Sequence, residues 1–476
     1  MRHHLGAIAL LATLPACAVN PATGERQLML VSEGQEVAMG READPQVSAQ
    51  YGLDPDSALQ AYVRGLGQRL AAASERPNLP WSFRVVDDPV VNAFALPGGF
   101  IYVTRGILAH FNSEAELVSV LGHEIGHVTA RHSASQMSQQ QLAQVGLVAG
   151  MVLAPRLQNF AGLAQAGLGL MFLKFSRDDE RQADELGLRY LTRARYEPRE
   201  MPKVFAMLAN VSQGESAGRL PGWLSTHPDP VDRQQRITQM IAAMPDSGPR
   251  AVNRNEYLRR LGGLMFDHNP REGFFRGQTF YHPDLRFQFT FPEGWRTANQ
   301  RQAVLAQPSG QDALLQVTLD EEVSPDAAVR AFVGQQGITP GPVRATSAGG
   351  LPAATARFVA NTADGVLAGL VGAVALDGRV YRLLGVTVEA RWPTYEAVVT
   401  ATFGSFGRLT DRAALAVQPL RLEIVTLDRA MTLEEFHRRY PSQVALDVVA
   451  RINQVRPPDR LAAGQLVKRV VGGPVP

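Results

Sequence analysis

His123-Glu124-Ile125-Gly126-His127 is the stretch that decides how this chain is interpreted. Two histidines four positions apart lie on the same face of a helix. Their neutral imidazoles suit Zn²⁺, and the glutamate beside the first one can accept a proton from a metal-activated water that attacks a peptide carbonyl. We therefore expect His123 and His127 to bind one Zn²⁺ per chain, with Glu124 as the general base of a hydrolase.

The residues around this motif favour a helix. Ser113 and Glu116 have the spacing of a capping box. Apolar residues recur at helical spacing and supply a buried stripe made of Leu117, Val120, Leu121, Ile125 and Val128. We interpret Gly126 as leaving room close to the metal. A helix that carries two histidines by chance is the competing interpretation, so the motif needs support from other parts of the chain.

A zinc peptidase needs a third protein ligand. A metzincin would place a histidine six residues after the second one, but that position is Ser133 here, and the neighbouring His132 is off the helix face. A later acidic run, residues 176–187, offers Glu180 instead, with Asp184 four residues further on the same face. Asp184 is placed to accept the free N–H of a liganding histidine. A solvated helix start is the competing interpretation of this run.

Four motifs follow one another along the chain: NAFALPGGFIYVTRG from Asn92, HEIGHVTARHS from His123, SRDDERQADELG from Ser176 and STHP from Ser225. Together they resemble the HtpX/BepA-type zinc peptidases, which are gluzincins related to the CAAX prenyl proteases. The resemblance covers about residues 26–245. It implies that His123, His127 and Glu180 hold the zinc ion and that Glu124 is the base.

The resemblance also implies two further roles. In gluzincins the edge strand before the zinc helix pairs with the substrate backbone, so Asn92, Ala93, Phe94 and Ala95 would bind an extended peptide by β-augmentation, unless they form a plain core hairpin. The histidine of the last motif, His227, would return to the active site. It would act there either as a fourth zinc ligand that latches the enzyme or as a donor to the oxyanion. A turn histidine before a helix start is the competing interpretation.

The first residues have the pattern of a bacterial lipoprotein signal. Basic residues precede an apolar run, Leu5 to Leu14, which is too short to span a bilayer, and Cys17 follows as the only cysteine of the chain. We expect a signal peptide over residues 1–16, lipidation at Cys17 and a tether over residues 17–31. Ala18 in place of an aspartate resembles the pattern for outer-membrane sorting, with the protein facing the periplasm. An ordinary secretory peptide is the alternative.

Composition limits the partners and the number of domains. A formal net charge of +2 with 19% charged residues gives no reason to expect nucleic acid as a partner. A length of 476 residues is typical of about three domains. We expect a peptidase domain over residues 32–250. Its apolar region from Leu142 to Lys174 is interrupted by polar residues, so we expect buried or cleft-covering helices there rather than a membrane span. A shallow membrane contact is the alternative.

Two accessory domains are expected after the peptidase domain. Residues 269–410 show period-two strands and the hairpin signal Asp377-Gly378, and resemble a PsbP-like α/β sandwich. Residues 420–476 follow a strand, helix, helix, strand pattern and resemble a LysM module. Such modules bind peptidoglycan, but Ala430-Met431 replaces the usual Gly-Asp, so glycan binding and a purely structural cap both stay open.

The expected fold class is therefore α+β. A mainly helical HExxH gluzincin domain with a small edge sheet would be followed by an α/β sandwich and a small LysM-like βααβ module. The expected function is that of a zinc metalloendopeptidase, lipid-anchored to the bacterial outer membrane and facing the periplasm. Its substrates would be misfolded or unassembled envelope proteins. A latched chaperone or scaffold for envelope proteins, with little basal proteolysis, is the alternative.

Overall fold

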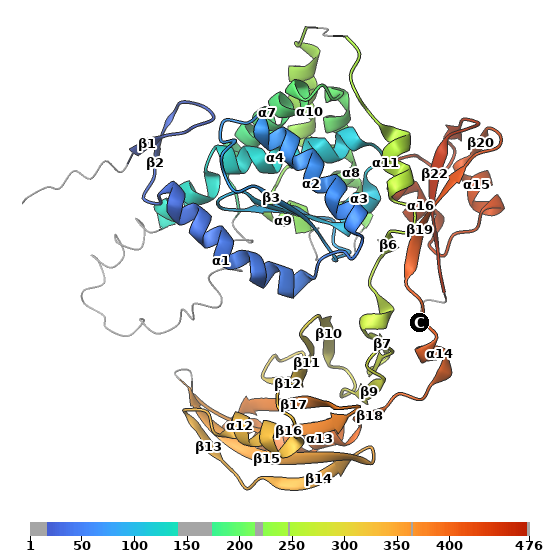
Figure 1. The fold of residues 1–476 in the computed structure, drawn as a ribbon. Helices are drawn as coiled ribbons and strands as arrows, with labels where there is room; N and C mark the ends of the chain where they lie inside the picture. Colours follow the sequence, from blue (N-terminus) through green and yellow to red (C-terminus); the bar gives the residue numbers. More distant parts are fainter. Residues whose placement is uncertain (1–16, 141–173, 215–221, 246–247, 363–364, 474–476) are drawn as a thin grey trace, which may run out of the picture. The chain divides into compact units, whose positions relative to one another are not determined.

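The two helices that carry the predicted zinc residues lie side by side in the computed structural model (Figure 1). They are α4 (Glu114–Thr129) and α7 (Arg177–Arg193). The structure describes residues 17–140, 174–214, 222–245, 248–362 and 365–473. Both helices belong to a unit formed by Met1–Phe266 and Arg421–Val471, and a second unit comprises Asp267–Leu420 and Gly472–Pro476. The domain boundaries expected from the sequence stay predictions.

Glycines let α4 and α7 approach closely. A Cβ atom at Gly187 would lie 3.0 Å from the backbone nitrogen of His123, and one at Gly122 would lie 3.1 Å from the carbonyl oxygen of Gly187. A Cβ atom at Gly126 would lie 3.0 Å from the carbonyl oxygen of Ala183. Gly126 therefore makes room for α7 rather than for the metal, which corrects our expectation. The close packing brings the histidines of α4 toward the acidic residues of α7.

The start of α4 differs in one respect from the predicted capping box. Ser113 is the N-cap, and its hydroxyl accepts a hydrogen bond from the backbone N–H of Glu116, as expected. The Glu116 carboxylate, however, accepts from the backbone N–H of Asn112 instead of that of Ser113. The α7 helix has the complete motif, in which Ser176 and Asp179 cap one another's backbone N–H groups.

A small sheet precedes α4. It contains β3 (Ser82–Val86), β4 (Ala93–Leu96) and β5 (Phe100–Thr104) in the order β3-β5-β4, with β3 parallel and β4 antiparallel to β5. The Pro97-Gly98-Gly99 turn joins β4 and β5, and both glycines have positive φ. This confirms the predicted strand pair, with β4 at an edge. The preceding helices are α1 (Glu33–Tyr51) and α2 (Ser57–Ala72).

Further helices of this unit lie before and after α4. Helix α3 (Arg105–His110) joins β5 to α4, and a helical segment at residues 132–140 follows α4. After α7 come a 3-10 turn at Pro198–Glu200 and the helices α8 (Met201–Gly214), α9 (Gly222–Thr226), α10 (Pro230–Ala242) and α11 (Arg254–Arg260). Upstream, β1 (Cys17–Val19) pairs with β2 (Arg26–Leu28). The sequence also predicts a flexible loop from Gly214 to Gly222, and residues 215–221 of it lie outside the described residues.

The C-terminal segment belongs to the same unit as α4 and α7. The predicted strand, helix, helix and strand are β19 (Leu420–Thr426), α15 (Leu433–Arg439), α16 (Leu446–Asn453) and β22 (Leu466–Val471). Two short strands, β20 (Met431–Thr432) and β21 (Arg460–Leu461), were not predicted. Strands β22, β19 and β6 (Met265–Phe266) form one sheet. The LysM assignment and peptidoglycan binding stay predictions.

Lys468 of β22 joins this segment to the turn that begins α4. Its side chain is fully buried, and Nζ donates to the carbonyl oxygens of Ala109 and Phe111, each at 2.8 Å. Gln454 donates to the Glu116 carboxylate at 2.9 Å. Burial lowers the pKa of Lys468 well below its usual value and raises the pKa of Glu116 to about 7. The C-terminal segment thus fixes the chain just before α4.

The second unit is an antiparallel α/β structure. Its larger sheet contains β10 (Arg296–Gln300), β11 (Ala303–Gln307), β12 (Ala313–Asp320), β13 (Ile338–Pro340), β14 (Arg344–Ala348), β15 (Leu351–Thr362), β16 (Gly365–Leu376) and β17 (Arg379–Val388). A smaller sheet contains β7 (Phe274–Arg276), β8 (Thr279–His282), β9 (Phe287–Thr290) and β18 (Gly407–Arg408). The helices are α12 (Pro325–Val333), α13 (Trp392–Gly404) and α14 (Arg412–Leu415).

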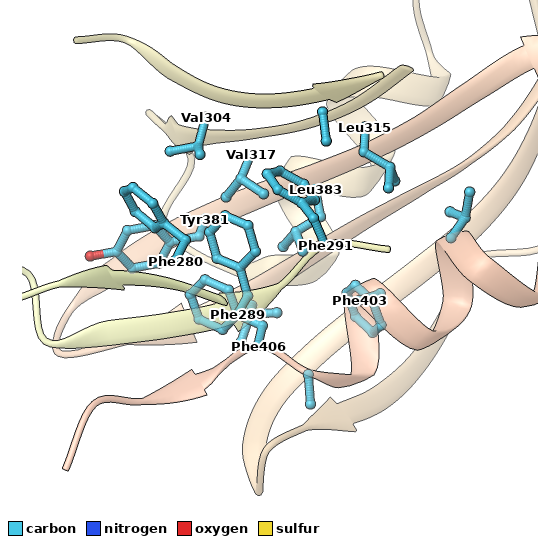
Figure 2. Packing of buried hydrophobic residues seen from close by; sticks show 14 of the residues in the cluster. Phe280, Phe289, Phe291, Val304, Leu315, Val317, Tyr381, Leu383, Phe403 and Phe406 are labelled. Carbon is cyan, nitrogen blue, oxygen red and sulfur yellow. The ribbon is translucent and has the colours of Figure 1, made fainter. Parts of the chain in front are cut away.

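An aromatic core fills the space between the two sheets of this unit. Figure 2 shows Phe280, Phe289 and Phe406 packed beside Tyr381 of the larger sheet. The predicted Asp377-Gly378 hairpin is confirmed: Leu376 pairs with Arg379, and both turn residues have positive φ.

The predicted helices between Leu142 and Lys174 fall outside the described residues, apart from Lys174 itself. None of the helices in the described part of the chain combines the length and the apolar character that crossing a bilayer requires.

We predict that replacing Gly187 with valine lowers the free energy of unfolding by about 1–3 kcal/mol, because overpacking forces α4 and α7 apart. Urea denaturation followed by tryptophan fluorescence measures this change. Gly65→Val is the matched control, since a Cβ atom there meets only the Arg69 guanidinium at 3.8 Å. The control is expected to change stability by less than about 0.5 kcal/mol. Equal losses in both variants would contradict the close-packing argument.

Candidate metal centre

Four side chains from three segments meet between α4 and α7. His123 and His127 come from α4, Glu180 comes from the first turn of α7, and His227 follows α9 directly. All four residues are buried, and their donor atoms lie within 4.8 Å of one another. The structure therefore brings together the three predicted zinc ligands and the histidine of the last motif.

The spacing of these donor atoms fits a zinc ion. In a tetrahedral site with bonds of about 2.0–2.1 Å, neighbouring donor atoms lie roughly 3.3 Å apart. The Nε2 atoms of His123 and His127 are 3.0 Å apart, and Nε2 of His127 is 3.4 Å from Oε1 of Glu180. Nδ1 of His227 lies 3.4 Å from Nε2 of His123 and 2.7 Å from Oε1 of Glu180. Two or three imidazoles and one carboxylate are a donor set that zinc prefers.

Asp184 and Arg233 support the first ligand. Nδ1 of His123 lies 2.9 Å from Oδ1 of Asp184, so the imidazole donates there and keeps its Nε2 lone pair for a metal. Arg233 of α10 donates to both oxygens of Asp184, at 2.8 and 2.6 Å. The same guanidinium lies 2.6 Å from Oε2 of Glu180. One arginine thus orients a ligand carboxylate and the carboxylate that holds a ligand histidine.

The electrostatics of the site favour a neutral His123 imidazole and ionised carboxylates on Glu180 and Asp184. Burial, together with the charge of Arg233, lowers the pKa of His123 to about 3. Burial acts to raise the pKa of Glu180, but His227 and Arg233 hold it well below its usual value. Burial also acts to raise the pKa of Asp184, and Arg233 lowers it. These are the protonation states that zinc ligands and their supporting groups require.

Glu124 differs from the other carboxylates. Its side chain is 1% exposed, and Oε1 accepts no hydrogen bond within the described part of the chain. Burial raises its pKa to about 7. When Glu124, Glu180 and Asp184 are all ionised, Arg233 balances one of three negative charges, and the two that remain equal the charge of Zn²⁺. The buried charges of this site therefore fit a divalent cation.

Aromatic rings cover the donor set. Trp223 stacks on His227 with ring centroids 4.3 Å apart, and Phe175 stacks on His127 at 4.0 Å. The side chain of His227 is 1% exposed, like that of Glu124. Nε2 of His227 lies 3.7 Å from Oε1 of Glu124, on the side where a general base would act. The site is closed in this arrangement.

The predicted substrate strand, β4, lies next to α9, the helix that carries Trp223. Ala93, Phe94 and Ala95 belong to β4, and Asn92 directly precedes it. The Phe94 ring is buried and stacks on Tyr102, so its side chain belongs to the core. A Cβ atom at Gly222, the first residue of α9, would lie 2.7 Å from the Val90 side chain. The first turn of α9 thus packs against the residues that lead into β4.

Three residues that contact the donor set were not predicted to do so from the sequence. Arg233 lies in a polar helix whose sequence shows no sign of a buried cation, and Trp223 precedes the histidine motif by only two residues. His132 is not among the grouped metal donors, in line with its predicted position off the ligand face, but it contacts the other ring nitrogen of His127. Only its nearness to the zinc motif could have drawn attention to His132.

Part of the chain is similar in sequence to known peptidases. Residues 57–241 match the family described as Peptidase family M48. The beta-barrel assembly-enhancing protease of Yersinia pestis is 34% identical over 239 residues, which are 48% of this chain and 49% of that protein. The mitochondrial metalloendopeptidase OMA1 of Arabidopsis thaliana is 38% identical over 172 residues, 36% of this chain and 33% of that protein. The chain thus spans about half the length of the first of these relatives and a third of the second.

One solved structure, that of cyanobacterial PsbP from Synechocystis, matches 28% of this chain and 91% of its own chain. With 17% identity and a TM-score of 0.24, it leaves the PsbP-like assignment a prediction.

The family match covers the residues that build the site, including His123, Glu124, Glu180 and His227. The relatives that align with this region are named as proteases and metalloendopeptidases. Residues 57–241, which carry the whole donor set, are therefore similar to the metallopeptidases of peptidase family M48.

Proposed function

We propose that this protein is a zinc-dependent endopeptidase of the bacterial cell envelope that cleaves misfolded or unassembled outer-membrane proteins. The observation that carries the proposal is the buried donor set of His123, His127 and Glu180 with Glu124 beside it. The names of the beta-barrel assembly-enhancing relatives support the substrate class. The latched chaperone is not favoured, because the same relatives are named as proteases.

Each residue of the site has one role in the proposed hydrolysis. A bound zinc ion supplies Lewis-acid polarisation for the attack of water on a peptide carbonyl. Glu124 removes a proton from the attacking water and returns it to the amine nitrogen as the C–N bond breaks. His123, His127 and Glu180 hold the ion, and Asp184 fixes the tautomer of His123 through its Nδ1–H.

His227 is proposed to be a latch. Its Nδ1 atom lies beside the other donors, its ring packs under Trp223, and Glu124 is closed off from solvent. A peptide carbonyl cannot reach Glu124 while His227 and α9 stay in this position. The alternative role, a hydrogen-bond donor to the oxyanion, would place His227 beside a bound substrate instead.

Movement of α9 would also open the predicted substrate strand. The backbone N–H of Trp223 in α9 donates to the carbonyl oxygen of Val91 at 3.2 Å. This carbonyl oxygen, which lies just before β4, is therefore already hydrogen-bonded to α9. Displacement of α9 would expose this acceptor at the edge of the small sheet, where an extended peptide could pair with it. We propose that latch release and substrate binding at Asn92 to Ala95 are one event.

The first prediction concerns the general base. Glu124→Gln is expected to keep one zinc per chain but to lose peptidase activity on an unfolded protein by at least about a hundredfold. Metal analysis and cleavage of unfolded casein measure the two properties. His123→Ala, His127→Ala and Glu180→Ala are expected to lower zinc content itself. Undiminished cleavage by purified Glu124→Gln would remove that residue from the mechanism.

The second prediction separates the two roles of His227. If His227 is a latch, His227→Ala raises basal cleavage of casein and of the protein itself, and zinc remains bound by the other three ligands. If it donates to the oxyanion, the same variant loses about a hundredfold or more in turnover. The expected result is the increase. A strong loss of activity with normal zinc content would support the donor role instead.

The third prediction concerns the anchor. If Cys17 is lipidated, Cys17→Ala releases the protein from membranes into the soluble fraction, because a lipid chain is the proposed attachment. Fractionation of cells that produce either form, with immunoblotting of each fraction, measures the change. Retention of Cys17→Ala in the outer-membrane fraction would show that a different attachment exists.

A further inference from the structure

His132 connects a zinc ligand to two other parts of the chain. It begins the helical segment at residues 132–140, just after α4, and is 3% exposed. Its Nδ1 atom lies 2.9 Å from Nδ1 of His127, and its Nε2 atom lies 2.8 Å from Oε1 of Gln182 on α7. Both ring nitrogens of His132 therefore have a polar partner at hydrogen-bond distance.

The direction of each hydrogen bond follows from metal binding. His127 presents Nε2 to the other donors, so its lone pair must lie there and its proton on Nδ1. That N–H donates to Nδ1 of His132, which must then be an unprotonated acceptor. The proton of a neutral His132 consequently sits on Nε2 and donates to Oε1 of Gln182, which matches the observed partner. One arrangement of protons therefore satisfies both hydrogen bonds of the path, which we define as the chain from His127 through His132 to Gln182.

Asn20 fixes the outer end of this path. Its Nδ2 group lies 3.2 Å from Oε1 of Gln182 and 3.2 Å from the carbonyl oxygen of Ala130, at the end of the zinc helix. Its Oδ1 atom accepts hydrogen bonds from the backbone N–H groups of Ala22 and Thr23, so the amide cannot rotate freely. Asn20 is itself 3% exposed and lies in the turn between β1 and β2.

The two histidines of the zinc motif are thus held by different groups. Asp184, a carboxylate fixed by Arg233, holds His123, whereas a neutral imidazole holds His127. We propose that His132 is a positioning residue for the zinc ligand His127, and that Gln182 and Asn20 keep His132 in the acceptor tautomer. This inference rests on the proposed peptidase site. Supporting groups of this kind typically contribute about 10–100-fold to metal affinity.

The test is the zinc dissociation constant of the full-length chain, measured by competition with a chromogenic chelator. His132→Leu removes the acceptor and is expected to weaken zinc binding about 10–100-fold. His132→Asn is expected to recover most of this loss, because the amide oxygen can take the place of Nδ1. Gln182→Leu does not touch the ligand histidine and is expected to weaken binding less than His132→Leu does. A partly buried histidine of the second unit provides the control, and His282→Leu should bind zinc like the wild type.

The outcomes separate this inference from the proposed function. A wild-type chain that binds no zinc would overturn both. Zinc binding by His132→Leu with wild-type affinity would overturn only the positioning role, and so would equal losses in His132→Leu and His132→Asn, which would indicate lost packing rather than a lost acceptor. If thermal unfolding shows that His132→Leu does not fold, Gln182→Leu decides: wild-type affinity in this variant overturns the proposed path, and a weakened affinity supports it.

Discussion

Charge balance in a buried space is the constraint on which the rest of the site depends. Glu124, Glu180 and Asp184 lie in the interior between α4, α7 and α10, where an unpaired carboxylate is costly. Arg233 compensates one of them, and a divalent cation would compensate the other two. The glycines at the contact between α4 and α7 let the two helices bring their donor atoms to one point, and His227 closes over that point.

The sequence predicted which side chains the structure brings together, because the central motif is local. His123 and His127 are separated by one helical turn, so their shared face needs no tertiary information. A later helix had to supply the third ligand, and the acidic run offered Glu180 and Asp184 at the spacing of one face. The strand pair around Pro97-Gly98-Gly99 and the Asp377-Gly378 hairpin were predictable for the same reason, since turn chemistry acts over a few residues.

What the sequence could not supply were contacts between distant segments. Arg233 of α10 donates to Asp184 of α7, and Asn20 donates to Gln182, which lies 162 positions away in the chain. The Glu116 carboxylate leaves the expected capping box for Asn112, and Gln454 of the C-terminal segment donates to the same oxygen. Such contacts depend on how helices pack, which no local pattern encodes. They also explain why Gly126 was assigned to the metal instead of to the contact with Ala183.

Both ends of the zinc helix are fixed by segments that are remote in sequence. Lys468 and Gln454 hold the turn before α4, while Asn20 and Gln27 donate to the carbonyl oxygen of Ala130 after it. Restraint at both ends would keep His123 and His127 in place if α9 moves, which is what the proposed latch requires.

X-ray absorption at the zinc edge of the purified full-length protein tests the central claim most directly. The account predicts one zinc ion per chain with only nitrogen and oxygen neighbours at about 2.0–2.1 Å and with the outer-shell signal of two or three imidazoles. A shell of oxygen atoms without imidazole signal, or a protein that holds no zinc after purification and addition of the ion, would contradict it.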